Sequence, residues 1–218
     1  TKKKKTMRLL AVALAALPLT LAAPPAVPTQ YFAQVTMTMP YYDLVEPISA
    51  WYDEQKGLGR LDYWEGVDRY IYNSSGEAYQ IVPTTSDGDS SEETCFKDGE
   101  GFDPVTMFPD LTYFPDEADE GDCNLNGVEC QSWTLRSPEY NDTTGFDGNY
   151  TYYVSTADNT PLRFHFTGFN VILGSHYDEY VFDYLQVSEG SQDDSHFLPP
   201  ASMTCVVLET DDDDAGGP

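Results

Sequence analysis

The side chains best suited to chemistry lie in the stretch ILGSHYDEYVFDY, which runs from Ile172 to Tyr184. It sets His176, one of three histidines, close in sequence to the carboxylic acids Asp178, Glu179 and Asp183. An imidazole that is oriented by carboxylates can act as a general base or as a metal ligand. A base also needs a nucleophile or a water molecule within hydrogen-bond reach, and the sequence places none beside it.

The same stretch has the pattern of a half-buried β-strand. From residue 179 onward its side chains alternate between two faces, as they do along a strand. Gly174 and Ser175, just before it, are a turn or bulge signal. We therefore expect a strand that follows a tight turn. His176 would lie at the start of this strand and be held by carboxylates. One face would carry Tyr180, Phe182 and Tyr184, and the other Val181, Asp183 and Leu185.

Motifs for a nucleophile are absent from the sequence. It contains no GxSxG, no HExxH and no glycine-rich phosphate loop. None of its cysteines has the surroundings of a papain-like nucleophile. We expect no catalytic residue, and hence no enzyme activity of this chain alone.

The segment DCNLNG raises a calcium hypothesis. Asp122, Asn124, Asn126 and Gly127 match the first, third, fifth and sixth positions of an EF-hand loop, where oxygen ligands converge on a hard cation. The twelfth position should be a bidentate glutamate, but it is Trp133, and helical flanks are missing. An ordinary Asx-rich turn is the alternative, and we favour it; no other cofactor is expected.

Four cysteines, Cys95, Cys123, Cys130 and Cys205, predict two disulfides. Four cysteines allow three connectivities. Metal ligation is the weaker alternative, because Cys123 and Cys130 do not have a CxxC spacing and no histidine lies near them.

The first residues predict a secretory route. Residues 1–22 combine a basic start with the apolar run LLAVALAALPLTLAA, which is typical of a signal peptide. Residues 1–6 do not look native, Met7 is the expected start, and cleavage is expected near Ala22. A membrane anchor is the alternative, and it would need about 20 apolar residues. Glycosylation sequons begin at Asn73, Asn141 and Asn149.

The charge of the chain is strongly acidic. It is −26 overall, and it becomes −31 without residues 1–22, because five of the eleven basic side chains and none of the 37 acidic ones lie there. Such a surface repels nucleic acid and anionic lipid. It suits cationic partners or a low-pH lumen, or it serves general solubility; no stable membrane insertion is expected.

The rest of the chain predicts an all-β, mainly antiparallel fold with little helix. Period-two alternation with β-branched and aromatic residues recurs along residues 29–209, which we expect to form one domain with a strongly curved sheet or half-barrel. A short helix could form around Val105 to Leu111, and the acidic tail 210–218 should be disordered. About ten strands are expected, at 31–39, 48–53, 60–66, 68–73, 77–83, 92–97, 129–136, 149–156, 161–170 and 179–187.

Two stretches carry a family resemblance. PYYDLVEPISAWYDEQKGLGRLDYWEG, from Pro40 to Gly66, and FNVILGSHYDEYVFDY, from Phe169 to Tyr184, resemble the N-terminal, non-catalytic region of counting-factor-associated and two-chain haemocyte papain-like cysteine proteases. The resemblance covers about residues 35–188. The residues that carry it are Trp51, Tyr52, Asp53, Arg60, Asp62, Tyr63, Gly66, Gly174, Ser175, His176, Tyr177, Asp178, Tyr180, Asp183 and Tyr184.

The resemblance implies a scaffold role for these residues, including His176. Such regions are similar to ependymin and LolA-like half-barrels, and they precede an inhibitory propeptide and a papain-type catalytic domain. After Pro200 this sequence continues with ASMTCVVLETDDDDAGGP instead. The implied protein is either a fragment of a longer protease or a free-standing accessory domain.

The implied function is a secreted or endolysosomal, non-catalytic accessory domain that assists the folding, association or regulation of a papain-like catalytic chain. A second hypothesis is a hydrophobic-ligand or lipid carrier, because an imperfectly closed sheet makes a concave apolar pocket. For the disulfides, the family-like core favours Cys95 with Cys130, because both flank strands predicted there. That leaves Cys123 with Cys205.

Overall fold

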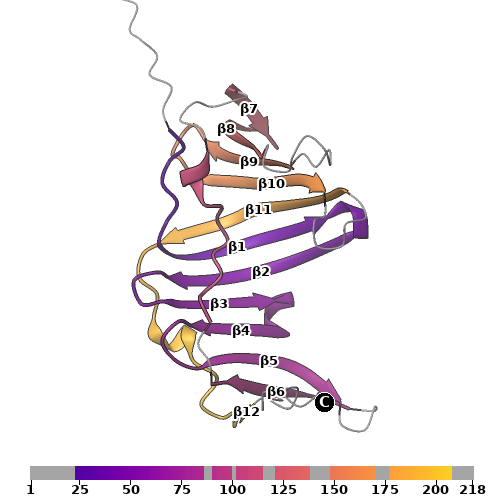
Figure 1. Ribbon diagram of the computed structural model, residues 1–218, viewed down its shortest axis with the longest axis vertical. Helices are drawn as coiled ribbons and strands as arrows, with labels where there is room; N and C mark the ends of the chain where they lie inside the picture. The colour runs from indigo at the N-terminus through magenta and orange to yellow at the C-terminus, as the bar shows by residue number, and fades with distance from the viewer. Residues whose placement is uncertain are drawn as a thin grey trace, which may run out of the picture.

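The computed structural model describes residues 23–85, 90–99, 102–114, 121–137, 148–169 and 177–207. They form one twelve-stranded sheet with the order β12-β6-β5-β4-β3-β2-β1-β11-β10-β9-β8-β7 (Figure 1). β12 and β7 are its two edges, so the sheet is open and not closed into a barrel. The strands are β1 (Gln30–Met39), β2 (Leu44–Asp53), β3 (Leu58–Tyr63), β4 (Asp68–Asn73), β5 (Ala78–Thr85), β6 (Ser91–Asp98), β7 (Gly121–Leu125), β8 (Val128–Ser137), β9 (Gly148–Ser155), β10 (Pro161–Phe169), β11 (Tyr177–Glu189) and β12 (Val206–Val207).

β1 lies between two wings of the sheet. It pairs antiparallel with β2 on one side and with β11 on the other, so that β2–β6 form one wing and β7–β11 form the second. Only β12 runs parallel to its neighbour, β6. The predicted all-β, mainly antiparallel fold is therefore confirmed, and each of the predicted strands overlaps an observed one.

Two strands and one helix differ from the sequence prediction. β7 was missed because acids and prolines outweigh any strand pattern around it, and β12 has only two residues. The short helix around residues 105–111 is wrong: residues 102–110 are irregular, and only a 3-10 turn, η3 (Leu111–Tyr113), follows. Pro104 and Pro109 each lack the N–H that a helix interior needs. The other helical elements in the described residues are also 3-10 turns, η1 (Pro40–Tyr42), η2 (Trp64–Gly66) and η4 (Asp194–Phe197).

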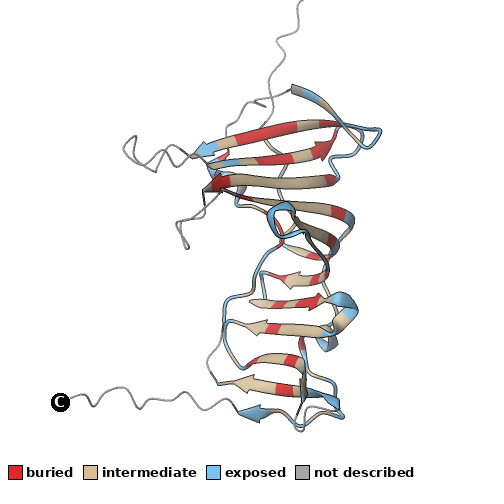
Figure 2. Ribbon diagram, turned by 90° about the vertical axis from the view of Figure 1, so that its right-hand side faces the viewer, coloured by how far each residue is buried: buried red, intermediate tan, exposed pale blue. Residues whose placement is uncertain are grey.

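Residues 102–114, here called the strap, cross one face of the sheet, the strap face (Figure 1). Met107, Phe108 and Phe114 of the strap pack against side chains from β1, β2, β3, β8, β9 and β11. Because successive side chains of a strand point to opposite faces, alternate residues of each strand supply this core. Buried positions recur in strands along the height of the sheet (Figure 2). The buried strand residues of this core are Tyr31, Ala33, Val35, Ile48, Ala50, Leu61, Trp133, Tyr152, Val154 and Tyr184.

Two buried tyrosines fix the strap to the sheet. The Tyr184 hydroxyl donates to the Met107 carbonyl at 2.7 Å, and the Tyr31 hydroxyl accepts from the Met107 amide at 2.8 Å. Burial raises the pKa of Tyr31 to about 12, and it raises the pKa of Tyr184 well above its usual range. Gly59 allows the strap to approach closely, because a Cβ at this position would lie 2.6 Å from the Pro104 Cβ.

A second, smaller core lies on the opposite face, in the β2–β6 wing. Ile71 of β4, Ile81 of β5, Cys95 of β6 and Phe197 of η4 form it. The chain that follows β11 therefore returns along this face through η4 and pairs with β6 as β12. The strap thus covers parts of both wings on one face, whereas η4 covers the β2–β6 wing on the other.

The disulfides differ from the pairing that the sequence favoured. The structure joins Cys95 to Cys205 and Cys123 to Cys130. Cys123 and Cys130 stand opposite each other in the β7–β8 hairpin, and Cys205 directly precedes β12 at the side of β6. The expected Cys95–Cys130 and Cys123–Cys205 pairs are wrong because Cys95 and Cys130 lie in different wings.

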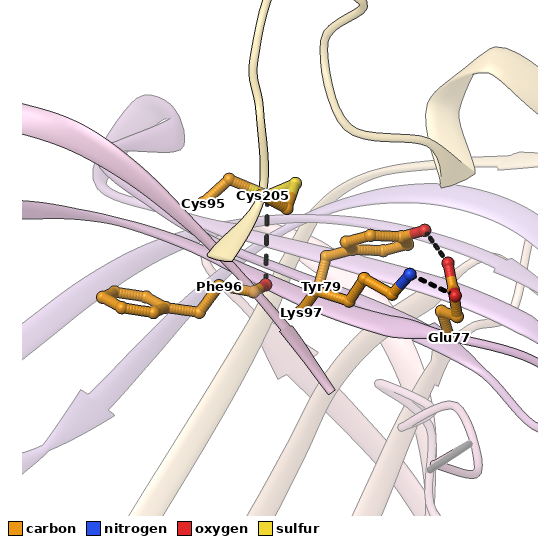
Figure 3. The surroundings of a disulfide bond; sticks show 6 residues. All are labelled: Glu77, Tyr79, Cys95, Phe96, Lys97 and Cys205. Atoms are coloured by element: carbon orange, nitrogen blue, oxygen red, sulfur yellow. Dashed lines mark hydrogen bonds and ion pairs between the residues drawn. A yellow bond between two sulfur atoms is a disulfide. The ribbon is translucent and has the colours of Figure 1, made fainter. Parts of the chain in front are cut away.

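Polar contacts accompany the Cys95–Cys205 disulfide (Figure 3). Glu77 forms an ion pair with Lys97, and it accepts a hydrogen bond from the Tyr79 hydroxyl at 2.7 Å. These two contacts, the one with Lys97 first, lower the pKa of the Glu77 carboxyl. They link the start of β5 to β6, the strand that carries Cys95.

Two disulfides indicate an oxidising, extracellular-type environment. In the ranges described above, no helix is long and apolar enough to span a membrane. The predicted leader, residues 1–22, and the predicted acidic tail, residues 210–218, lie outside the described residues.

Candidate functional site

A row of half-buried aromatic rings crosses β9, β10 and β11 on the strap face. Tyr150 lies 4.8 Å from Phe166 and 6.4 Å from Phe164, measured between ring centroids. Phe164 in turn lies 5.9 Å from Phe182, and Phe166 lies 5.8 Å from Tyr180. The register of the three strands sets these rings opposite one another, as expected for cross-strand pairs on one face. We call these five residues the aromatic row.

The β2–β6 wing carries a groove, which we call the strap groove. Its volume is about 280 Å³, close to the lower end of the range for small-molecule sites. The Gln80 side chain donates to the Tyr70 hydroxyl at 3.0 Å, which fixes both polar groups at its wall. Burial is the main cause that raises the pKa of Tyr72 to about 12. The lining includes Tyr70, Tyr72, Ala78, Gln80, Phe96 and Phe102.

The stretch around His176 is only partly described. Gly174, Ser175 and His176, and the side chain of Tyr177, lie outside the described residues, so the role predicted for His176 stays a prediction. The predicted strand that follows is present as β11. Its alternation of faces is as expected, because Tyr180, Phe182 and Tyr184 all lie on the strap face.

The three carboxylates near His176 in sequence are divided between the two faces of the sheet. Asp178 is buried, and its carboxylate accepts from the Tyr180 hydroxyl at 3.3 Å. Glu179 and Asp183 point to the opposite face, where each pairs with a residue of β10. Glu179 lies 2.8 Å from a ring nitrogen of His165, and Asp183 lies 2.7 Å from Nε of Arg163. These carboxylates therefore do not converge on one catalytic centre.

Several residues of the family resemblance form a cluster on β2 and β3, beside η4. The Arg60 guanidinium donates to both carboxylate oxygens of Asp62, at 2.6 and 2.7 Å. It also donates to the His196 carbonyl at 3.1 Å and lies 5.1 Å from the centre of the Trp51 ring. Trp51 stacks on the His196 ring at 5.2 Å. This cluster holds η4 against β2 and β3.

Other residues of the resemblance shape turns and core. The buried Asp53 carboxylate accepts from the Lys56 amide at 3.1 Å and so closes the β2–β3 turn. Gly66 has a φ of 90°, which favours glycine, at the β3–β4 turn. Tyr52 stacks on Tyr31 at 5.3 Å in the strap-face core.

The DCNLNG segment forms a hairpin. Asn126 and Gly127 connect β7 to β8 with φ values of 51° and 90°, as in a type I′ turn. The Asn124 side chain accepts from the Gly127 amide at 2.9 Å, and Asp122 lies on β7. An EF-hand loop is therefore wrong here, since strands replace its flanking helices. No group of three or more His, Cys, Asp and Glu in the described ranges could hold a metal ion.

The sequons fall in different settings. Asn73 lies at the β4–β5 turn, where its side chain accepts from the Ser75 amide at 3.0 Å. Asn149 is exposed on β9, and Asn141 lies outside the described residues. Glycosylation at all three positions stays a prediction.

Sequence reasoning missed the strap groove. The strand 68–73 was predicted, and the two-residue spacing of Tyr70 and Tyr72 indicates that both tyrosines share a face. Phe96 and Phe102 come from β6 and the strap, and no sequence pattern links them to β4. Only the fold brings these aromatic residues together.

Comparisons with known proteins give a distant structural likeness. No family model matches the chain, and no curated protein matches it. Among solved structures, the chain is similar to an uncharacterized conserved protein from Thermus thermophilus, with 14% identity and a TM-score of 0.46. That match covers 84% of this chain and 92% of the other.

Proposed function

We propose that the chain is a secreted or endolysosomal, non-catalytic accessory domain related to papain-like cysteine proteases, which assists the folding, association or regulation of a catalytic chain. The observation that carries this proposal is a difference between the two faces of the sheet. Trp51, Arg60 and Asp62, three residues of the resemblance, hold η4 on one face. On the strap face the aromatic row, which includes Tyr180 of the resemblance, is half-buried and contributes surface.

A non-catalytic role is supported by the cysteines. All four sulfur atoms lie in disulfides, so none supplies the thiolate that a papain-type mechanism needs. The disulfides also support a secretory route, together with the signal-like sequence of residues 1–22.

The aromatic row is the expected contact surface for the catalytic chain. Aromatic residues are enriched at protein interfaces, where they supply large area with few rotatable bonds. Phe182 and Val181 offer a matched pair for a test, because they are adjacent on β11, both half-buried, and on opposite faces.

The experiment co-expresses the chain from residue 29 with a papain-type proenzyme in a secretory host, and active protease is counted with a thiol-reactive probe. We expect the chain to raise the yield of active protease, Phe182→Ser to remove this gain, and Val181→Ser to keep it. Probe labelling of the chain itself, or a yield that is the same with and without the chain, would contradict the proposal.

A second candidate function, binding of an apolar ligand, is favoured by the strap groove. Its lining is mainly aromatic and aliphatic, and Phe102 remains 49% exposed beside it. Native mass spectrometry after gentle extraction, and melting curves with added fatty acid, test this function. We expect Phe102→Ser to abolish a fatty-acid shift in the melting temperature, and Val105→Ser, which alters an exposed strap residue outside the groove lining, to retain it. A chain that never retains lipid and never shifts in melting argues against carriage.

A further inference from the structure

A second hollow on the strap face lies beside the β3–β4 hairpin. Its volume is about 280 Å³, and we call it the hairpin cage. It adjoins the strap groove through two shared tyrosines, Tyr70 and Tyr72, but its other residues differ. The cage is lined by Glu46, Tyr63, Trp64, Asp68, Tyr70 and Tyr72.

Strand register explains why these side chains meet. Tyr63 stands opposite Ile48 of β2 and opposite Asp68 of β4. Glu46 lies two residues before Ile48 and therefore shares its face. Tyr70 follows Asp68 on the same face, and its ring meets the Tyr63 ring edge-on at 5.9 Å. The cage is thus built into paired strands.

The hairpin turn adds the fourth aromatic residue. Trp64 and Glu65 have φ values of 52° and 59°, a left-handed conformation that is uncommon for residues with a Cβ, and Gly66 follows with 90°. This turn leaves Trp64 42% exposed at the wall of the cage. A bulky aromatic side chain is therefore displayed at the cage and kept out of the core.

The cage combines aromatic rings with negative charge. The rings of Tyr70 and Tyr72 stack at 6.5 Å, and aromatic faces carry partial negative charge that attracts cations. Burial, and then the nearby Glu46 carboxylate, raise the pKa of the Tyr63 phenol. Two carboxylates, Glu46 and Asp68, complete the wall.

Within the described residues, no Lys or Arg side chain pairs with the carboxylates of this site. After residue 22 it has six Lys and Arg side chains, all within the described ranges. Five of them pair with carboxylates outside the cage, and the sixth, Arg136, is on β8 in the other wing. The five are Lys56, Arg60, Arg69, Lys97 and Arg163.

We propose that the hairpin cage binds an organic ammonium cation, either the quaternary head of a small molecule or the ammonium of a lysine side chain. Aromatic faces attract both quaternary and lysine ammonium groups, and the two carboxylates add charge attraction. A hard metal ion suits the site poorly, because it takes six or more oxygen ligands and the cage offers two carboxylates. This inference does not depend on the proposed accessory function.

The test titrates the nitrogen-15-labelled chain from residue 29 with tetramethylammonium chloride, and with sodium chloride at equal ionic strength, at pH 7. We expect saturable shifts of the Trp64 indole resonance, identified among the three tryptophans by its loss in Trp64→Phe, and of the Tyr63 and Tyr70 amides. We expect Trp64→Leu and Glu46→Gln each to weaken binding at least threefold. Trp64→Phe should retain most of the affinity, because a ring remains.

Glu92→Gln is the matched control, since it removes the same charge from an exposed position of β6 outside the cage. Choline and Nα-acetyl-lysine methylamide then distinguish the two sources of the cation. The probe that binds with the higher affinity identifies whether a quaternary head or a lysine side chain is the source. The proposal is overturned if tetramethylammonium gives the same shifts as sodium. It is also overturned if Glu46→Gln and Glu92→Gln alter binding equally; the spectra of these surface variants report in the same experiment that they are folded.

Discussion

Loss of the Cys95–Cys205 disulfide should strongly destabilise this chain. The two cysteines are 110 residues apart in sequence, so the bond restricts a large loop of the unfolded chain. The chain-entropy relation assigns about 5 kcal/mol to a loop of this length at 25 °C. A domain of this kind has a free energy of unfolding of roughly 5–15 kcal/mol. We therefore expect Cys95→Ala with Cys205→Ala to remove a large part of the stability.

The second disulfide provides an internal comparison. Cys123 and Cys130 are seven residues apart and already adjacent in the β7–β8 hairpin. The same relation gives about 2.4 kcal/mol for so short a loop. The double alanine variant at these positions should therefore lose about half as much free energy of unfolding.

Urea unfolding monitored by circular dichroism measures both losses. Peptide mapping without reduction should first recover Cys95 linked to Cys205 in the unaltered chain. If the short-loop variant proves as destabilised as the long-loop variant, the argument from loop length does not hold for this chain.

Four further outcomes are expected. Gly59→Ala should cost about 1–3 kcal/mol of unfolding free energy in thermal melts, because its Cβ would meet Pro104, whereas Gly99→Ala, with open space around it, should be neutral. Arg60→Lys should lower the melting temperature more than Arg163→Lys, because the Arg60–Asp62 pair is less exposed and also holds η4; equal effects would contradict this. Burial raises the pKa of Tyr31 to about 12, so its contribution to stability is complete below its ordinary pKa near 10 and should fall by up to about 3 kcal/mol as the pH rises to 12. Urea unfolding between pH 8 and 12 measures this loss, and Tyr31→Phe should reduce it, while the other buried tyrosines keep the remaining pH dependence. Because the charge after residue 22 is −31, light scattering should find a monomer at pH 7 and more association near pH 4.5, with salt reducing the difference.

Strand positions were predictable from the sequence because alternation is a local signal. PLRFHFTGF became β10 with Phe164 and Phe166 on one face, as its pattern indicates. The disulfide pairing was not predictable, because it depends on which strands become neighbours. β6 and β8 lie in different wings, and no residue near Cys95 or Cys130 reveals this separation.

The candidate sites were likewise predictable from local spacing but not from long-range pairing. Tyr70 and Tyr72 share a face by their spacing, which the sequence shows. Their approach to Glu46 depends on the register of β2 with β3 and of β3 with β4, and a slip of one residue would place Glu46 on the other face. The conformation of Trp64 is also hidden, since a left-handed backbone is uncommon for tryptophan and the turn that imposes it is read only from the fold.

The central place of β1 has a consequence for how the chain is made. Its partner β2 follows at once, but its other partner, β11, arrives much later, with Tyr31 finally opposite Glu189. During synthesis β1–β6 can therefore assemble from local hairpins while one edge of β1 stays unpaired. An unpaired strand edge invites pairing with another chain. The nascent protein thus carries an unpaired edge at the position that is central in the finished sheet, and a chaperone would protect it by shielding β1 until β11 emerges.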